Sequence, residues 1–542
     1  MYKRFLILYG SLMGLFCLSF FWIDKISHEE KLYEAAANQQ SYKVKISDIR
    51  GSIYDCHGNL LVNNTKKLIA SAIPGLESLT ALLPVVPENK KAELYKKSSG
   101  KSPFNIEVER KVNSPYVKIF EIPIRYYGTP LAPHIIGYLS GDKKGVCGIE
   151  KAFDKYLYGE NHEIYVKYSV DASGKILPGK SNIIEDKSYL MSKGVALNID
   201  SKIQAIASEC ANKYIKRGAV IICEVPNCEI RACLSFPSFI PTNVGMSLND
   251  KDSPLLNRAF ASFNLGSVFK LITSAAALEC GVSPDFTYDC QGFNQIEDAK
   301  FKCFNSKKHE EVNMEQALAH SCNGYFIELI KKMPYDSVLK MAKKFRLGSP
   351  NTLAPEMSSS AGKLPSEESL QDIKTLANFS FGQGKLLASP VQISGVINTI
   401  ASEGVYSNPK LIKSLVNEAK KENLKILNLI PKEKERIISK KNADIIKSHM
   451  KASMDYGTSS KGLPENISAG AKTSTAQTGI IEDGKRVEQS WFAGFFPYEN
   501  PKYTVVILSE DGGGGGESCG PVFKEIAERM ASELPEIFSI PQ

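Results

Sequence analysis

The sequence predicts a multidomain α+β protein that begins with a transmembrane helix. Its 542 residues are enough for two or three domains, and 43% hydrophobic with 23% charged residues is an ordinary balance for folded protein. The run Phe5–Ile23 is apolar and uncharged. Residues 43–190 are mixed short strands and loops, whereas strand and helix patterns alternate from about residue 191 onward.

The run Phe5–Ile23 is long enough to cross the hydrocarbon core of a bilayer. Because Lys3 and Arg4 precede it, we expect the N-terminus in the cytoplasm and the chain from Asp24 onward on the extracytoplasmic face. A cleaved signal peptide is the alternative, but the run is long and no small-residue cleavage site follows it closely. We therefore expect residues 1–23 to form a cytoplasmic stub and a single-pass membrane anchor.

The region after the anchor divides into two expected parts. Residues 24–42 are charged and compatible with a helix, which suits a stem at the membrane surface. Further along, we expect helices at Ser201–Ile215 and Lys270–Glu279, and strands at Gly218–Cys223, Trp491–Phe496 and Tyr503–Ser509. A hairpin around Pro226-Asn227 would make small buried strand residues of Cys223, Cys228 and Cys233.

The mildly basic net charge suits an anionic membrane surface and gives little support for nucleic-acid binding. The formal net charge is +8, from 67 basic and 59 acidic residues, and no basic stripe interleaved with aromatic residues stands out. Only 7 histidines are present, and none lies in a recognisable catalytic motif, which disfavours Ser-His-Asp catalysis.

A serine and a lysine three residues apart, Ser267 and Lys270, open the helix expected at Lys270–Glu279. Residues at this spacing share one helix face, so the lysine amine can reach the serine hydroxyl and act as its base if burial lowers the lysine pKa. Among the other serines with this spacing to a lysine, Ser98, Ser360 and Ser407 contain proline or glycine inside the motif and lack this helical context.

Two later segments supply partners for this pair. Ser321-Cys322-Asn323 precedes an apolar helical segment, and Lys472-Thr473-Ser474-Thr475 carries the short polar side chains that suit the wall of a substrate groove. Each motif alone is weak. In the order S-x-x-K, S-x-N and K-T-small-T, the three together match the signature of penicillin-binding proteins and class A β-lactamases.

On these motifs the chain resembles the class B penicillin-binding proteins, which are monofunctional peptidoglycan D,D-transpeptidases. Further matching segments extend the resemblance over most of the chain and separate it from β-lactamases: Arg50–Gly58, Gly145–Glu150, Tyr156–Gly159, Asn198–Gln204, Pro254–Arg258, Gly382–Gly384 and Ser389–Gln392. The resemblance implies an elongated α+β pedestal domain at residues 24–190. It also implies a transpeptidase domain at residues 191–542, an antiparallel sheet flanked by helices as in serine β-lactamases.

The resemblance also implies roles for the motif residues. Ser267 would attack the carbonyl between two terminal D-alanines of a stem peptide, and Lys270 would accept its proton, kept neutral by burial and by a positive Lys472. Ser321 and Lys472 would relay the proton to the leaving amine. The remaining expected contacts are substrate binding by Asn323, Thr473, Ser474 and Thr475, and an oxyanion hole from the backbone N–H groups of Ser267 and Thr475.

One motif position departs from the family pattern. The third residue of the K-T-G-T motif is usually glycine and is Ser474 here. A serine side chain would narrow the groove or add a hydrogen-bond donor, so we expect retained activity with an altered preference among β-lactams.

Three alternatives to a transpeptidase stay open at this point. They are a serine β-lactamase or D,D-carboxypeptidase, a β-lactam sensor, and a non-catalytic scaffold of a wall-synthesis complex. By resemblance the expected partners are peptidoglycan stem peptides, β-lactams, the membrane and a membrane glycosyltransferase of the shape, elongation, division or sporulation type. Neither a cofactor, a metal nor a nucleic acid is expected.

The chain contains 12 cysteines. Cys290 and Cys303 flank a short glycine-containing segment and are candidates for a disulfide, whereas His309 nearby invites a zinc site. We do not expect zinc, because neither a C-x-x-C pair nor a second motif histidine supports it. Cys322, inside the second motif, is the cysteine expected nearest the substrate.

Two further features are expected to be structural. Gly512–Gly516 lacks the Gly-Lys-Ser/Thr of a phosphate-binding loop and is expected to form a flexible loop beside the catalytic groove. Arg50 and Glu150 lie in the two pedestal-type motifs, and we expect them to pair without taking part in chemistry.

Overall fold

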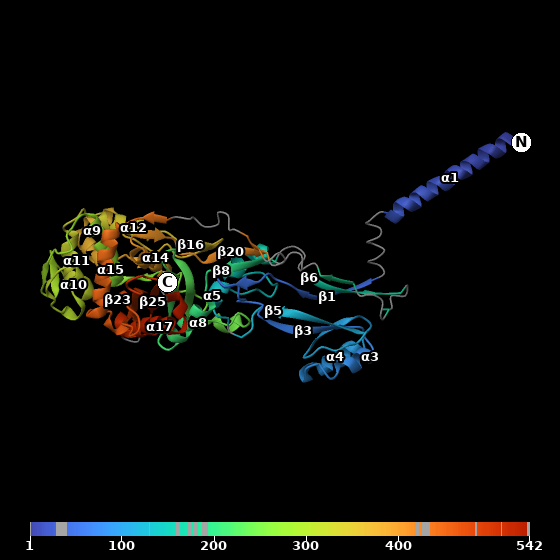
Figure 1. Ribbon diagram of the computed structural model, residues 1–542, viewed down its shortest axis with the longest axis horizontal. Helices are drawn as coiled ribbons and strands as arrows, with labels where there is room; N and C mark the ends of the chain where they lie inside the picture. Colours follow the sequence, from blue (N-terminus) through green and yellow to red (C-terminus); the bar gives the residue numbers. More distant parts are fainter. Residues whose placement is uncertain are drawn as a thin grey trace. The chain divides into compact units, whose positions relative to one another are not determined.

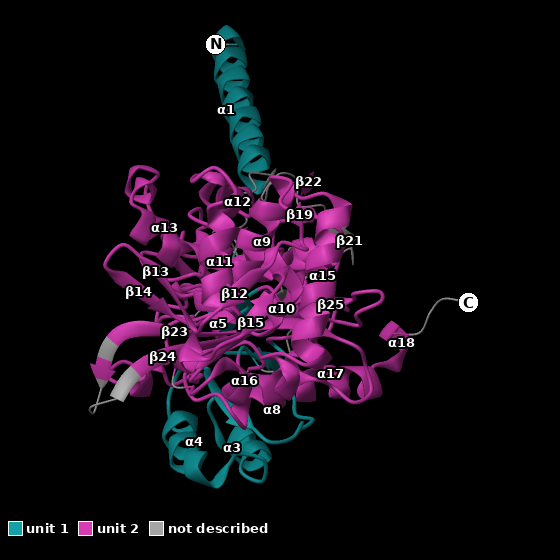
Figure 2. Ribbon diagram, turned by 90° about the vertical axis from the view of Figure 1, so that its left-hand side faces the viewer, with its two compact units in different colours: residues 1–50, 63–125, 158–192 teal, residues 51–62, 126–157, 193–542 magenta. Residues whose placement is uncertain are grey.

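The computed structural model describes residues 2–538, except for 29–40, 129, 159–162, 172–175, 178–182, 187–192, 418–421, 425–433, 483–484 and 511. The chain forms two compact units (Figure 2). The small unit contains residues 1–50, 63–125 and 158–192, and the large unit contains residues 51–62, 126–157 and 193–542. The chain therefore leaves and re-enters the large unit before residue 193, and the boundary expected near residue 190 stays a prediction.

Helix α1 (Tyr2–His28) contains the expected anchor and extends beyond it on both sides. Its segment Tyr2–Ser27 has a mean hydropathy of 2.0 and is not buried against the rest of the chain, so its length and composition suit a membrane span. Of the expected stem at residues 24–42, the first part continues α1, residues 29–40 lie outside the described residues, and Ser41 begins a strand.

The small unit is built on two antiparallel sheets. One has the order β1-β6-β7 and the other the order β4-β3-β5. Apolar residues of the second sheet pack with those of two short helices in one core. The elements are β1 (Ser41–Asp48), β3 (Thr65–Ala72), α3 (Leu76–Leu82), η1 (Glu88–Lys90), α4 (Lys91–Ser98), β4 (Phe104–Val108), β5 (Val117–Ile124), β6 (Glu163–Ser169) and β7 (Ile183–Asp186).

A five-stranded antiparallel sheet with the order β10-β9-β25-β24-β23 organises the large unit. Its strands are β9 (Gly218–Glu224), β10 (Glu229–Phe236), β23 (Gly470–Glu482), β24 (Lys485–Phe496) and β25 (Tyr503–Ser509). The strand side chains alternate between two cores: Trp491 and Phe495 of β24 face one, and Phe492 and Phe496 face the other. The sheet is therefore buried on both faces.

Helices cover both faces of this sheet. On one side, α8 (Ser201–Asn212) and α17 (Gly520–Glu533) share a core with it. On the other side, α9 (Lys270–Glu279), α14 (Pro390–Ala401) and α15 (Lys440–Asp455) do so. The expected antiparallel sheet between helical layers is confirmed. The expected helix at Ser201–Ile215 ends earlier, at Asn212, and the expected strands are present.

A mainly helical region carries the second motif and lies at one end of the large unit, where α9, α10, α11 and α12 gather (Figure 1). It contains two small hairpins, β12 (Tyr288–Cys290) with β15 (Glu310–Val312), and β13 (Phe293–Ile296) with β14 (Ala299–Lys302). The other elements here are η5 (Phe304–Ser306), α10 (Met314–Ala319), α11 (Asn323–Ile330), α12 (Ser337–Lys344), η6 (Glu368–Gln371) and α13 (Ile373–Ser380).

The remaining elements of the large unit are short and connect its layers. They are β2 (Ile53–Tyr54), α5 (Pro133–Ile136), α6 (Gly148–Ala152), β8 (Lys193–Leu197), η3 (Val244–Ser247), β11 (Phe263–Asn264), η4 (Gly266–Phe269), β16 (Thr352–Ala354), β17 (Met357–Ser358), β18 (Leu387–Ala388), β19 (Val405–Ser407), β20 (Ile412–Asn417), β21 (Glu422–Leu424), β22 (Lys434–Arg436), η7 (Ser460–Gly462), α16 (Gly515–Ser518) and α18 (Pro535–Phe538), with α7 (Asp154–Tyr158) at the unit boundary.

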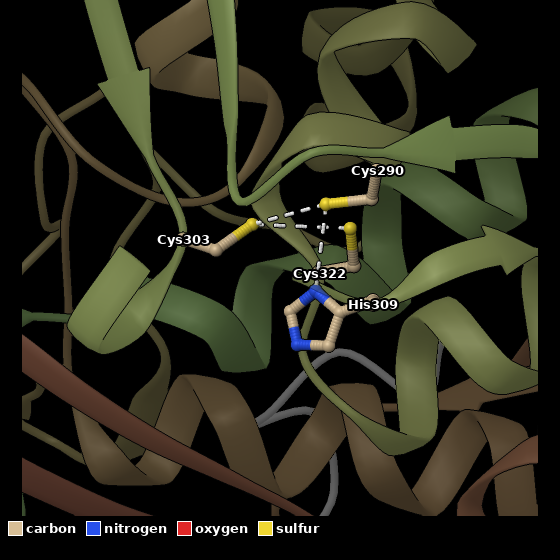
Figure 3. Close-up of side chains that lie close together, drawn as sticks. All are labelled: Cys290, Cys303, His309 and Cys322. Atoms are coloured by element: carbon tan, nitrogen blue, oxygen red, sulfur yellow. Dashed lines mark hydrogen bonds between the residues drawn. The ribbon is translucent and has the colours of Figure 1, made fainter. Parts of the chain in front are cut away.

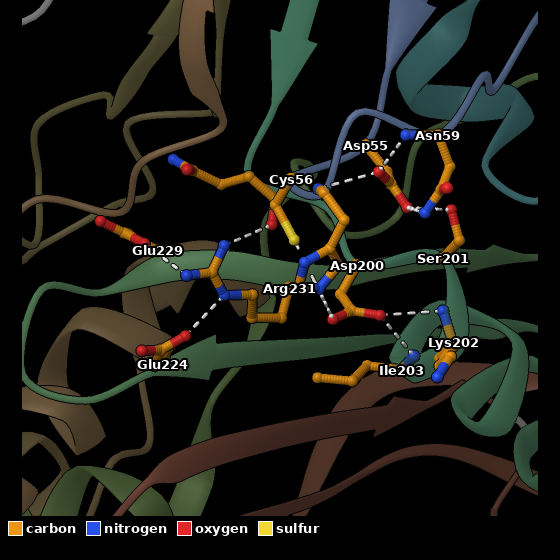
Figure 4. A network of polar contacts seen from close by, with 12 residues as sticks. Asp55, Cys56, Asn59, Asp200, Ser201, Lys202, Ile203, Glu224, Glu229 and Arg231 are labelled. Carbon is orange, nitrogen blue, oxygen red and sulfur yellow. Dashed lines mark hydrogen bonds and ion pairs between the residues drawn. The ribbon is translucent and has the colours of Figure 1, made fainter. Parts of the chain in front are cut away.

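Two sequence motifs that lie far apart along the chain meet in the large unit (Figure 4). Asp200 caps α8 by accepting from the backbone N–H groups of Lys202 at 2.9 Å and Ile203 at 3.2 Å, and His57 Nε2 lies 2.8 Å from the same carboxylate. Asp55 accepts a 2.7 Å hydrogen bond from the Ser201 hydroxyl. These contacts attach residues 51–62 to the start of α8, which gives both motifs a structural role.

Candidate active site

Ser267 and Lys270 lie at the junction of a 3-10 turn, η4, with helix α9. Residues three apart are eclipsed in a 3-10 turn, and the Lys270 Nζ is 3.1 Å from the Ser267 Oγ. Lys270 is fully buried, whereas Ser267 is partly exposed. The serine hydroxyl is thus accessible from solvent while its neighbouring amine is held away from water.

Lys270 also contacts the second motif. Its Nζ donates to the Ser321 carbonyl at 2.8 Å and to the Asn323 Oδ1 at 2.7 Å, and it lies 3.1 Å from the Ser321 Oγ. A neutral lysine amine has two N–H groups and one lone pair. With the two N–H groups directed to these short acceptors, the lone pair is left to the two serine hydroxyls.

The second motif is held in a constrained turn. Ser321 has φ of +59°, in the left-handed region that non-glycine residues seldom adopt. Cys322 caps α11, with its Sγ accepting from the Tyr325 N–H at 3.4 Å. The Asn323 Nδ2 donates to the Lys302 carbonyl at 2.9 Å, which fixes the amide so that its Oδ1 faces Lys270.

The third motif lies on β23, at the edge of the central sheet. Lys472 is fully buried, and its Nζ donates to the Thr473 carbonyl at 2.9 Å and to the Thr458 Oγ1 at 3.5 Å. The Thr473 hydroxyl donates to the same Thr458 oxygen at 2.8 Å. Thr458 is a site residue that the sequence analysis did not single out, because it belongs to none of the three motifs.

Burial lowers the pKa of both site lysines. The pKa of Lys270 falls from 10.5 to about 8, although the adjacent Cys322 and Cys303 act in the opposite direction. The pKa of Lys472 is well below its usual value, because of burial first and of the Lys270 charge second. Burial thus disfavours both ammonium groups, and the expected positive Lys472 beside a neutral Lys270 stays a prediction.

Ser474 lies against Gly266, the residue before Ser267. Its side chain is 3% exposed, and its Oγ has no hydrogen-bond partner among the residues that the structure describes. A Cβ placed on Gly266, whose φ is +60°, would lie 2.3 Å from this oxygen. The extra hydroxyl therefore contacts the backbone beside Ser267 from a buried position.

The glycine run lies beside the third motif, but Gly515 and Gly516 begin helix α16 where a loop was expected, and the flexibility of the run stays a prediction. The Gly515 N–H donates to the Thr475 Oγ1 at 3.1 Å. A Cβ on Gly515 would lie 2.3 Å from the Ser474 carbonyl and 2.5 Å from the Trp491 carbonyl, so glycine allows the close approach of the loop to β23 and β24. The Thr475 hydroxyl, having accepted this bond, retains its own O–H for a ligand.

Sequence comparison matches residues 218–528 to the penicillin-binding protein transpeptidase domain and residues 45–188 to the penicillin-binding protein dimerisation domain. The chain belongs to the penicillin-binding protein transpeptidase family. Both matched domains fit the class B organisation that the motifs indicated.

Two relatives cover most of this penicillin-binding protein. Stage V sporulation protein D of Bacillus subtilis is 27% identical, over 94% of this chain and 81% of its own length. The peptidoglycan D,D-transpeptidase FtsI of Escherichia coli is 25% identical, over 86% and 77%. A solved structure that describes the coordination of polymerization and crosslinking by a peptidoglycan synthase complex has a TM-score of 0.71, at 22% identity and with 97% and 98% coverage, and it supports the fold.

A cluster of three thiols and an imidazole adjoins the second motif of this penicillin-binding protein (Figure 3). It consists of Cys290, Cys303, His309 and Cys322, whose donor atoms all lie within 4.8 Å of one another. The structure has Cys290 and Cys303 as free thiols with their sulfurs 3.7 Å apart, so the disulfide considered from sequence is not formed. The sequence analysis considered zinc at Cys290, Cys303 and His309 but did not join Cys322 to them, because the spacing along the chain does not show that the four side chains converge.

A second group of possible metal ligands, Cys56, His57 and Asp200, has a structural explanation. The Asp200 carboxylate already accepts two backbone hydrogen bonds at the start of α8. Cys223, Cys228 and Cys233 are buried, as expected, and Cys223 and Cys233 lie in strands, whereas Cys228 lies in the turn between them. Arg50 and Glu150 are both buried, and their expected pairing stays a prediction.

Proposed function

We propose that this chain is a membrane-anchored peptidoglycan D,D-transpeptidase that works through an acyl-enzyme on Ser267. The observation that carries the proposal is the position of Lys270, whose Nζ lies 3.1 Å from both the Ser267 Oγ and the Ser321 Oγ. Its pKa of about 8 leaves a usable fraction of neutral amine near physiological pH. Such an amine is the base that a serine nucleophile needs in the absence of histidine.

In the acylation step, the Ser267 Oγ forms a bond to the carbonyl carbon between two terminal D-alanines, and its proton passes to Lys270. The C–N bond then breaks, and the leaving D-alanine amine takes a proton that Ser321 delivers. The 3.1 Å between the Ser321 Oγ and the Lys270 Nζ supports this relay, since Lys270 is protonated once it has accepted the Ser267 proton. Lys472, buried and hydrogen-bonded to Thr458, is the other member of the proposed relay.

The remaining motif residues hold the substrate in this proposal. Asn323, whose amide is oriented by Lys302 and Lys270, binds the stem-peptide amide. The hydroxyls of Thr473 and Thr475 bind the terminal carboxylate. The backbone N–H groups of Ser267 and Thr475 form the oxyanion hole, where loss of one donor costs on the order of 3 kcal/mol.

The second step separates this function from its main competitor. In a transpeptidase an amine of a neighbouring stem peptide attacks the acyl-enzyme and closes a cross-link, whereas in a β-lactamase or a D,D-carboxypeptidase water attacks. The similarity of most of this chain to the peptidoglycan D,D-transpeptidase FtsI supports attack by the amine. Helix α1 suits an anchor that keeps the catalytic unit on the extracytoplasmic face, where stem peptides are cross-linked.

The similarity to a solved peptidoglycan synthase complex also supports a partner that polymerises glycan strands. The solved complex that coordinates polymerization with crosslinking contains a chain of similar fold. We infer that this chain also works beside a membrane glycosyltransferase, which would supply the strands that it cross-links. Co-purification of a tagged copy with such an enzyme, lost when α1 is replaced by an unrelated membrane helix, would support this partnership.

The test of the function uses the full chain in detergent micelles with a fluorescent penicillin. We expect wild type to be labelled stoichiometrically and to stay labelled, because a transpeptidase releases the acyl group slowly to water. Ser267→Ala should abolish labelling, and Ser262→Ala, a nearby serine outside the motifs, should label like wild type. Stoichiometric labelling of Ser267→Ala would refute the nucleophile, and turnover of the label within seconds would favour a β-lactamase.

A further inference from the structure

Three thiols and one imidazole converge at the end of the large unit that holds the second motif. The Sγ of Cys303 lies 3.7 Å from that of Cys290 and 3.9 Å from that of Cys322. The Nδ1 of His309 lies 3.5 Å from the Cys290 Sγ. The three cysteines are at most 3% exposed, and His309 is half-buried. The four donor atoms therefore surround a single point rather than pairing off.

These separations are those of a tetrahedral metal site. An ion with Zn–S bonds of about 2.3 Å and Zn–N bonds of about 2.1 Å holds its sulfurs about 3.8 Å apart and each sulfur about 3.6 Å from the nitrogen. A disulfide, by contrast, needs its two sulfurs about 2.05 Å apart, and it does not explain why the third thiol and the imidazole lie beside them. Three cysteines and one histidine also form one of the common ligand sets of structural zinc.

The ligands are held by regular structure before any ion binds. Cys290 ends β12, and the paired strand β15 begins directly after His309, whose N–H donates to the Cys290 carbonyl at 3.2 Å. The Cys303 N–H donates to the Gly292 carbonyl at 2.9 Å, and Cys322 caps α11. A preformed site of this kind binds a metal without a large cost in ordering the chain.

From this geometry we propose that Cys290, Cys303, His309 and Cys322 bind one zinc ion, which holds the Ser321–Asn323 turn in position. The proposal corrects the sequence-based expectation of no metal, which relied on the missing C-x-x-C pair. The fold brings together four ligands that the sequence separates, so that pair is not needed.

The proposed site is connected to the active site through two short paths. Cys322 lies between Ser321 and Asn323, so a bond from its sulfur to zinc restrains both neighbours. Lys302, the residue before Cys303, accepts the hydrogen bond from the Asn323 Nδ2 at 2.9 Å. Asn323 in turn accepts from Lys270 at 2.7 Å. This positioning role rests on the proposed function, whereas metal binding does not.

The first experiment measures metal in the full chain, purified with detergent under reducing conditions and without a metal-binding tag. We expect inductively coupled plasma mass spectrometry to find about one zinc ion per chain. His309→Asn and Cys303→Ser should lose the zinc. The matched controls are His320→Asn, whose ring stacks on His309 with centroids 6.0 Å apart, and Cys280→Ser, an exposed free cysteine. Both controls should retain it.

A ligand variant could lose zinc because it fails to fold, so the site is also tested in the wild-type protein. After zinc is exchanged for cobalt, we expect the ultraviolet charge-transfer band of cobalt–thiolate bonds and the intense visible bands of a tetrahedral site. Wild type that contains no zinc and gives no cobalt–thiolate band would overturn the proposal. Zinc retained by folded His309→Asn and Cys303→Ser, or a Cys290–Cys303 disulfide in protein purified with its thiols trapped, would also overturn it.

The positioning role is tested by acylation. Removing zinc from wild type with a chelator should slow labelling of Ser267 by fluorescent penicillin, on the order of tenfold, as is typical when the support of a reacting group is lost. Added zinc should restore the rate, and magnesium should not. Unchanged labelling of the zinc-free protein would refute the positioning role but leave the metal site. If zinc is bound and no form is labelled, the proposed function fails and the site stands.

Discussion

Gly266 and Ser474 form a contact that makes the sharpest test of the structure. Gly266 precedes the nucleophile and has φ of +60°, and a Cβ there would lie 2.3 Å from the Ser474 Oγ and 3.1 Å from the Ala476 Cβ. The substitution Gly266→Ala therefore introduces both backbone strain and a clash. In the Ser474→Gly background only the strain and the smaller contact with Ala476 remain.

The backbone strain and the clash should each lower the free energy of unfolding of Gly266→Ala. An alanine in the left-handed region costs about 1–2 kcal/mol, and an extra methyl in a packed site costs about 1–3 kcal/mol. We thus expect Gly266→Ala to lower the free energy of unfolding by about 2–5 kcal/mol in wild type. In the Ser474→Gly background about 1–3 kcal/mol of this loss should be recovered, which is the coupling free energy of the two positions.

Denaturant unfolding of wild type, the two single variants and the double variant measures this coupling free energy. If the clash also displaces Ser267, the rate of labelling by fluorescent penicillin should fall most in the variant that unfolds most easily. Gly281→Ala is the matched control, since Gly281 has φ of +82° and open space where a Cβ would lie. Gly281→Ala should lower the free energy of unfolding only by the cost of backbone strain, about 1–2 kcal/mol. An equal cost of Gly266→Ala in both Ser474 backgrounds would refute the contact. Comparing Ser474→Gly with wild type across several β-lactams tests whether the buried hydroxyl alters their preference.

Two further predictions follow. Since neutral Lys270 is the proposed base and burial lowers its pKa to about 8, the acylation rate should rise with pH and reach half its maximum near pH 8; a midpoint at the usual 10.5 would contradict this. Arg258 is 3% exposed and forms an ion pair with Glu510, so Arg258→Ala should lower the free energy of unfolding by about 3–5 kcal/mol. Arg529→Ala, which removes two more exposed pairs, with Glu209 and Glu533, should cost about 1 kcal/mol or less; equal effects of the two variants would show that burial of the pair does not matter.

Much of the catalytic arrangement was predictable because its signals are local. The spacing of Ser267 and Lys270 depends only on one turn of helix, and the structure has that turn with the two atoms 3.1 Å apart. The strands of the central sheet were recognisable because each is a short apolar run bounded by turn residues. The helix at Ser201 was predicted too long because Asn212 ends it, while the chain continues in turns to Ile215.

By itself the sequence determined the family, the three motifs, the apolar segment at the N-terminus and the pairing of Ser267 with Lys270, the proposed nucleophile and base, because each lies in contiguous residues. Only the tertiary structure decided what depends on distance between segments. It placed Thr458 beside Lys472, directed the Ser474 hydroxyl against Gly266, and gave Lys472 a lower pKa than usual through burial. It also assembled the thiol cluster around Cys322 from four strand and helix ends, since a ligand set is defined by where side chains converge and not by their spacing along the chain.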